Sequence, residues 1–238
     1  MSDTATDLPP GKALSAGRVE ELFTTPEGTY RFCRWGRPIA PVVFGVDDET
    51  LGHLKDAMAM VLEIAEMEFV DTDPELGANL MIFFCSDWDE LDMVPNLDQL
   101  LPDFDILKNS LKRTGASQYR SFSFDENGAI KVCIVLLRFD EHMAETSVQT
   151  MGVAQMTQAI LVWGDEAFED ESPIALIPET GMCIVKPGYA AVIRAAYDPA
   201  LPPSSMDSSH AMRLAARAKL LLKDGGEGEE TAGDDASV

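Results

Sequence analysis

A β-type run, an amphipathic helix and a buried strand follow one another in the first half of the chain, and this succession constrains the fold most. Residues 41–46 (PVVFGV) favour a strand and precede Asp47 and Asp48, which can cap a helix. Apolar residues then recur at helical spacing over 49–67. Residues 78–85 (ANLMIFFC) are typical of a buried strand. A βαβ unit of this size predicts two parallel strands joined by a right-handed crossover.

The second half of the chain adds a hairpin and further helices. Residues 118–124 and 129–138 flank the sequence DENG, which favours a hairpin turn. One helix of about 20 residues is expected over 142–163, and two more over 189–197 and 209–222. We therefore expect an α+β fold: a mixed sheet with a βαβ unit and a hairpin, packed on a long central helix and followed by a helical C-terminal part.

Length and composition predict one folded unit with polar ends. The chain has 238 residues, of which 46% are hydrophobic, enough for one substantial core. Residues 1–18 are expected to be a flexible N-terminal segment, and 19–223 a single α+β domain. Residues 224–238 carry six acids and no base, which predicts a disordered acidic tail.

The charge and the apolar runs exclude several classes of function. The formal net charge is −23, and −17 remains outside the acidic tail, so the surface repels phosphate backbones and anionic headgroups. Binding to nucleic acid is therefore not expected. Runs such as 129–137 are too short to span a bilayer, and the N-terminus has no apolar core of a secretory signal. These features predict a cytoplasmic protein without a membrane span.

The cysteines agree with that compartment. Cys33, Cys85, Cys133 and Cys183 are widely separated, with no CxxC pair and no histidine at ligand spacing. We interpret them as small buried hydrophobic residues, because three of them lie in or at the end of apolar runs. No base that would activate a thiol is evident in the sequence.

The most basic stretch of the chain, residues 30–38 (YRFCRWGRP), is a candidate docking surface. Arg31, Arg34 and Arg37 alternate there with aromatic residues that include Trp35. Arginine and tryptophan are enriched in interface hot spots, so the stretch can bind an acidic protein partner. The alternative is a first strand whose arginines pair with the chain's own acids.

Two glutamines mark the expected central helix. Gln155 and Gln158 lie one turn apart on the same face, next to an apolar stripe that ends at Trp163. One interpretation is a polar edge of the helix. The other is that the two amides line a pocket and hydrogen-bond a ligand or a neighbouring segment.

Several short pieces resemble an uncharacterised bacterial family, many of whose members are described as lipoproteins. The matching pieces spread over residues 34–215: Arg34-Trp35 before Pro38, Ala78-Asn79-Leu80, Gln158-Ala159-Ile160-Leu161 followed by Asp165, and Ala196-Tyr197-Asp198-Pro199 with Leu201-Pro202-Pro203. The order of elements is also similar to the N-terminal half of zincin-type metallopeptidases. The resemblance implies a zincin-like topology.

The zinc chemistry of that fold is missing from the sequence. A zincin helix needs HExxH, with two histidines for the metal and a glutamate for its water. The corresponding positions hold Ala154, Gln155 and Gln158, and the three histidines of the chain lie in separate segments. No Walker loop, GxGxxG or GxSxG sequence occurs either. We therefore expect no metal site and no cofactor.

These observations favour a non-catalytic binding or accessory protein that acts through protein–protein contacts in the cytosol. The candidate binding residues are Arg31, Arg34, Trp35, Arg37, Gln155, Gln158 and Asp165. The alternative is a hydrolase related to zincin metallopeptidases, with an active site around Gln155, Gln158 and Asp165. The identity of the protein partner does not follow from the sequence.

Overall fold

The computed structural model describes residues 12–227 of the chain. Within them the main sheet has four strands in the order β2 (Pro41–Phe44), β3 (Leu80–Cys85), β5 (Ile130–Arg138) and β4 (Gln118–Phe124). The first three are parallel, and β4 runs antiparallel to β5 at the edge. The expected mixed sheet and the mixture of helices and strands are confirmed.

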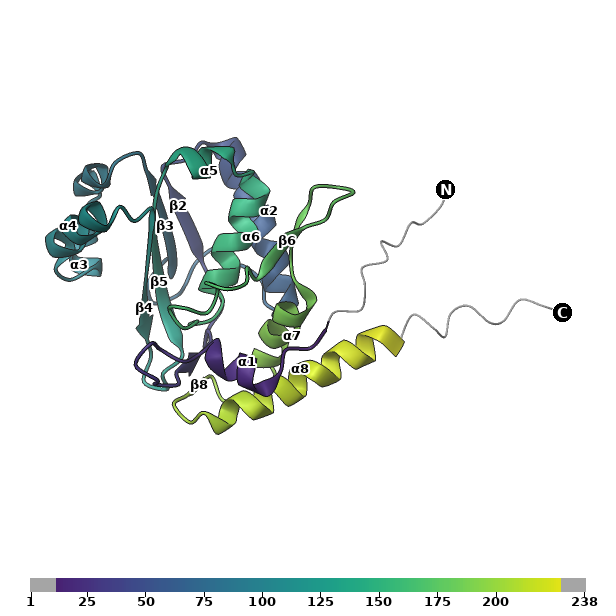
Figure 1. The fold of residues 1–238 in the computed structure, drawn as a ribbon. Coiled ribbons are helices and arrows are strands. Elements are labelled where there is room, and N and C mark those ends of the chain that lie inside the picture. The colour runs from purple at the N-terminus through teal and green to yellow at the C-terminus, as the bar shows by residue number, and fades with distance from the viewer. Residues whose placement is uncertain (1–11, 228–238) are drawn as a thin grey trace.

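The βαβ unit forms as its sequence predicts. Helix α2 (Asp48–Ile64) connects the parallel strands β2 and β3, and the side chain of Asp47 caps it by accepting from the backbone N–H of Thr50 at 2.8 Å. Its apolar residues, such as Leu54 and Met58, are buried in the larger core. Helices α2 and α6 (Val148–Ala159) pack side by side over one face of the sheet (Figure 1).

Short helices cover the opposite face of the sheet (Figure 1). They are the 3₁₀ helix η1 (Trp88–Met93), α3 (Leu97–Leu100) and α4 (Phe104–Thr114). A second, smaller core lies there, in which Trp88, Leu91 and Leu111 pack with Phe83 and Leu136 of the sheet.

The prediction of one long central helix over 142–163 is wrong. The segment forms two helices, α5 (Glu141–Glu145) and α6, because Thr146 adopts an extended conformation at φ −86° and ψ 130°. Ser147 then starts a new helix by accepting from the backbone N–H of Thr150 at 3.1 Å. Helix α6 ends at Ala159, and Leu161 already pairs with Arg34 in an isolated bridge.

The remaining elements form a helical layer beside α6. Helices α1 (Ala16–Glu21), α7 (Pro187–Ala196) and α8 (Ser209–Glu227) pack together, and two small two-stranded sheets flank them: β1 (Phe32–Cys33) with β8 (Ser204–Ser205), and β6 (Ile174–Leu176) with β7 (Cys183–Val185). No helix of this described part is long and apolar enough to cross a membrane.

The ends of the folded part differ from the expected boundaries. Helix α1 begins at Ala16, and Leu14 already packs against the core, so the structure starts before residue 19. Helix α8 continues past residue 223 to Glu227. The rest of the two terminal segments, residues 1–11 and 228–238, lies outside the described residues.

Candidate functional site

Trp35 lies in the core and is not part of a docking surface. Its side chain is 1% exposed, and its indole Nε1 donates to the carbonyl of Ala159 at 2.8 Å. Its backbone forms a bridge with Ile130, which ties the segment to the N-terminal end of β5. The aromatic half of the expected patch is therefore inaccessible to a partner.

The three arginines of that stretch point to different places. The guanidinium of Arg31 lies 4.3 Å from the centre of the Phe124 ring. That of Arg34 lies 5.4 Å from the ring of Tyr197 and donates to a backbone carbonyl. Arg37 forms ion pairs with Asp73 and Glu75, as the alternative interpretation expected for these arginines. The structure does not bring the predicted cluster together.

Gln155 and Gln158 do come together, around an arginine that the sequence analysis missed. Arg120 of β4 donates from one terminal nitrogen to Oε1 of Gln158 at 2.9 Å and from the other to Oε1 of Gln155 at 2.5 Å. A guanidinium has no acceptor, so both amide oxygens must face it. The Nε2 of Gln155 continues the network to Oε1 of Gln118 at 3.4 Å.

Arg120 has no carboxylate partner within residues 12–227. Its Nε is buried and makes no hydrogen bond. Burial lowers the pKa of Arg120 below the ordinary value of arginine, and burial also raises the pKa of the neighbouring Cys133 to about 12. A buried cation without a carboxylate partner lowers the stability of the fold. Such a cation is unusual in this chain, because its 41 acidic residues could supply a partner.

One signal in the sequence points to Arg120. Side chains alternate along a strand, so Arg120 lies on the same face of β4 as Phe122 and Phe124, which pack against the larger core. An arginine in phase with inward-facing aromatic residues contacts the layer above the sheet. That layer, helix α6, could not be placed over β4 from local patterns.

A cavity of about 330 Å³ opens beside this network. Gln118, Ala154 and Gln158 form one side, and Asp165, Phe168, Glu169, Ser172, Pro173 and Ile174 the other. The structure thus brings Gln158 and Asp165 to one cavity, with Gln155 behind its wall. Asp165 and Glu169 are exposed and form no ion pair with any described residue. The cavity therefore offers amide donors on one side and unpaired carboxylates on the other.

The outer edge of β4 is open next to the cavity. Ser117, the residue before β4, accepts from the backbone N–H of Arg138 at 2.8 Å. Hydrogen-bonded pairs alternate along an antiparallel ladder, so the backbone N–H and C=O groups of Gln118, Arg120 and Phe122 point away from β5. Within the described part of the chain these groups have no hydrogen-bond partner.

Several polar groups at and around the site are already hydrogen-bonded within the fold. The amide oxygens of Gln155 and Gln158 are already bonded to Arg120, and His210 lies in the core with Tyr30. Ser172 Oγ accepts from the N–H of Ile174. Among residues 12–227 no three His, Cys, Asp or Glu side chains are grouped to hold a metal ion. The arrangement is suited to binding.

Comparisons with protein-family models, with curated proteins and with solved structures found no match for this chain. Its function must therefore be argued from the residues of the site.

A double substitution tests whether the Arg120 network is retained at a cost to stability. Arg120→Met is expected to lower the free energy of unfolding by about 1–2 kcal/mol, because it leaves the amide oxygen of Gln155 buried without a donor. Arg120→Met combined with Gln155→Leu removes the cation and its buried partner, while the half-buried Gln158 can bind water, and is expected to restore the wild-type value or exceed it by about 1 kcal/mol. Urea unfolding measures both. A double variant less stable than the single one would show that the network stabilises the fold.

Proposed function

We propose that this chain is a non-catalytic protein-binding module of the cytosol, which binds an extended segment of its partner along β4. The observation that carries the proposal is the open edge: the outward backbone groups of Gln118, Arg120 and Phe122 have no partner within residues 12–227. Exposed edges of this kind bind peptides by adding a strand to the sheet. Main-chain hydrogen bonds then supply affinity and side-chain pockets supply specificity.

The charges select the partner segment. A side chain of an added strand can enter the cavity beside Gln118, where the unpaired carboxylates of Asp165 and Glu169 favour lysine or arginine. The net charge of −23 steers a basic segment toward this protein. The amide Nε2 of Gln158 has no partner among the described residues and can donate to a peptide carbonyl. The proposed ligand is therefore an extended segment with one lysine or arginine.

Two finer points belong to this proposal. A cytosolic location is supported by the four cysteines, which lie within the described residues, are all buried and form no disulfide. A zincin-like topology without the metal chemistry is supported by the packing of α2 and α6 on one face of the mixed sheet, and α6 carries Ala154, Gln155 and Gln158 where the resemblance implies HExxH.

The test compares Gln118→Pro with Gln118→Ala. An array of extended peptides with single lysine or arginine residues identifies a binder, whose Kd is then measured by fluorescence polarisation. Gln118→Pro removes an outward N–H without breaking a bond to β5, and is expected to weaken binding at least tenfold. Gln118→Ala keeps that N–H, and a change below about threefold is expected.

The carboxylates provide a second readout on the same peptide. Asp165→Asn with Glu169→Gln is expected to weaken the lysine or arginine peptide about tenfold and to leave its alanine counterpart unchanged. Urea unfolding of each variant shows that the fold is intact. The proposal fails if no peptide of the array binds, or if Gln118→Pro and Gln118→Ala bind equally well.

A further inference from the structure

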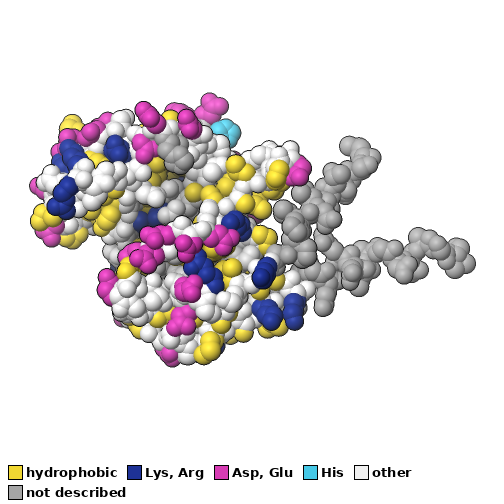
Figure 2. All heavy atoms as spheres, in the orientation of Figure 1, with side chains coloured by type: hydrophobic (Ala, Val, Ile, Leu, Met, Phe, Trp, Pro, Cys, Tyr) yellow, Lys and Arg dark blue, Asp and Glu magenta, His cyan; other side chains and the backbone are white. Residues whose placement is uncertain are grey.

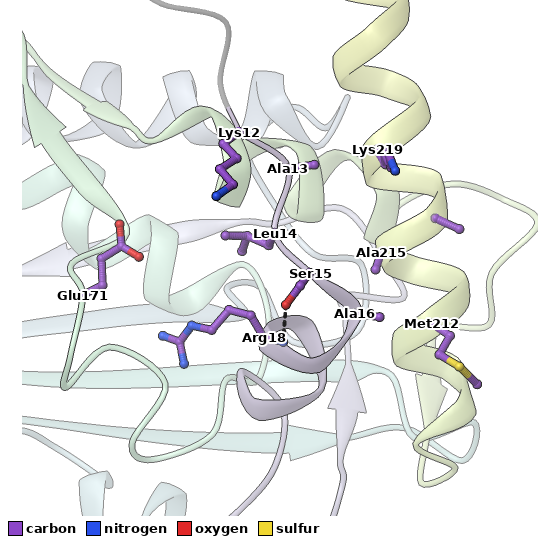
Figure 3. A pocket seen from close by; sticks show the side chains of 11 residues that line it. Lys12, Ala13, Leu14, Ser15, Ala16, Arg18, Glu171, Met212, Ala215 and Lys219 are labelled. Carbon is purple, nitrogen blue, oxygen red and sulfur yellow. Dashed lines mark hydrogen bonds between the residues drawn. The ribbon is translucent and has the colours of Figure 1, made fainter.

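A larger cavity, of about 690 Å³, lies between the N-terminal segment and helix α8, away from β4. Figure 3 shows α8 facing residues Lys12 to Ala16, with Met212, Ala215 and Lys219 along the side of the helix. Ala13 and Ala16 lie on the side of the segment that faces α8, whereas Leu14 extends to the other side. Much of the lining is apolar, and one of its apolar side chains, Met212, is 60% exposed to solvent.

The charged groups of this cavity are mostly cations. Lys12 and Lys219 form no ion pair with any residue whose side chain the structure describes, that is, residues 12–223 without His142. Arg18 donates to the carbonyl of Ala167 at 2.8 Å and to the exposed carboxylate of Glu21. Figure 3 shows Lys12 and Arg18 extending to the same side of the segment.

The acidic residue in the lining pairs with neither Lys12 nor Lys219. Glu171 accepts from Lys186 at 3.0 Å and from the hydroxyl of Tyr189 at 3.3 Å. The bond to Lys186 and the nearby cations hold the pKa of Glu171 below its usual range, so it stays ionised and paired. Positive charge therefore remains in excess, on a protein whose net charge is −23.

The surface around the cavity is also positively charged. Figure 2 shows several Lys and Arg side chains gathered over the region of α1 and α8, on a face that elsewhere carries many acids. A local positive field of this kind attracts an anion despite the net charge of the whole chain.

We propose that this cavity binds a single-chain amphiphilic anion, with a phosphate or carboxylate head held by its cations. Lys12 and Lys219 supply the charge for the head, because Arg18 is already paired with Glu21. Met212 and Ala215 of α8, with Ala13 and Ala16 of the segment, supply the surface for an alkyl chain. An apolar lining next to unpaired lysines fits a ligand that has both an alkyl chain and an anionic head. This site is independent of the edge of β4.

Calorimetric titration of the full chain with dodecyl phosphate, below its micelle concentration, tests the proposal. One site per chain is expected. Inorganic phosphate tests the head alone and dodecyl maltoside tests the chain alone, and both are expected to bind at least tenfold more weakly. Lauric acid distinguishes a carboxylate from a phosphate head, and binding of either head at one site supports the proposal.

Variants locate the site. Lys12→Gln with Lys219→Gln is expected to weaken dodecyl phosphate at least tenfold, and Met212→Gln about threefold to tenfold. Lys223→Gln changes an exposed lysine of the same helix outside the cavity and is the matched control. The proposal is overturned if the double lysine variant binds as the wild type does, or if phosphate or the maltoside binds as tightly as dodecyl phosphate.

Discussion

Trp35→Ala is expected to lower the free energy of unfolding by about 3–5 kcal/mol. The indole is 1% exposed and contributes to the larger core, so its removal leaves a cavity. The substitution also leaves the carbonyl of Ala159 without the donor that now lies at 2.8 Å. Urea unfolding at neutral pH measures the loss.

Two variants frame that measurement. Trp35→Phe keeps most of the apolar volume and loses the N–H donor, so a smaller loss of about 1–2 kcal/mol is expected. Met93→Ala, at a side chain that is 85% exposed, is expected to change stability by less than about 0.5 kcal/mol. A loss below about 1 kcal/mol for Trp35→Ala would contradict the buried position of the indole.

The position of Trp35 also decides how a partner is to be sought. Loss of a partner in a pull-down with Arg34→Ala and Trp35→Ala would report unfolding, because Trp35 supports the core. Substitutions at the exposed residues Gln118, Asp165 and Glu169 change the candidate site without removing buried apolar surface.

The elements that could be predicted are those that local patterns determine. Alternation and apolar runs identified β3 and the β4–β5 hairpin, and Gly128 adopts the positive φ of 75° that the DENG turn suggested. The capping residue Asp47 marked the start of α2. Each of these signals acts over a few residues, so the sequence alone was sufficient.

The features that were missed depend on contacts between distant segments. The break between α5 and α6 is the exception, because the extended Thr146 and the cap formed by Ser147 are local features that helical spacing over 142–163 did not reveal. The stretch 30–38 has the composition of a surface patch, yet pairing with β5 and β8 buries it in part. Arg120 has a function in the site only because α6 packs above β4.

Acidification is expected to destabilise the protein through His210 before most carboxylates titrate. His210 is fully buried on α8, where Nδ1 lies 2.9 Å from the hydroxyl of Tyr30 and Nε2 has no partner. Burial lowers the pKa of His210 to about 4, with a contribution from the charge of Arg213, while Asp207 opposes the shift. The folded protein therefore holds this histidine neutral.

The sign of the effect follows from proton binding. Between the unfolded pKa of about 6.5 and the folded value of about 4, the unfolded chain binds a proton that the folded chain does not. The free energy of unfolding is therefore not reduced by His210 above about pH 6.5, and it decreases as the pH falls from 6.5 toward 4. This group alone is expected to lower the free energy of unfolding by about 2 kcal/mol between pH 7 and pH 5.

Paired substitutions isolate that contribution. Tyr30→Phe with His210→Leu removes the titrating ring together with the hydroxyl that would lose its partner, and the decrease between pH 7 and pH 5 is expected to be about 2 kcal/mol smaller than in the wild type. His53→Gln changes an exposed histidine of α2 and is the matched control. Parallel profiles for the wild type and the double variant would assign the acid sensitivity to carboxylates such as Asp73. Burial alone would raise the pKa of Asp73. Its hydrogen bonds from the backbone of Leu76 and Glu75 and its ion pair with Arg37 outweigh that effect and lower the pKa.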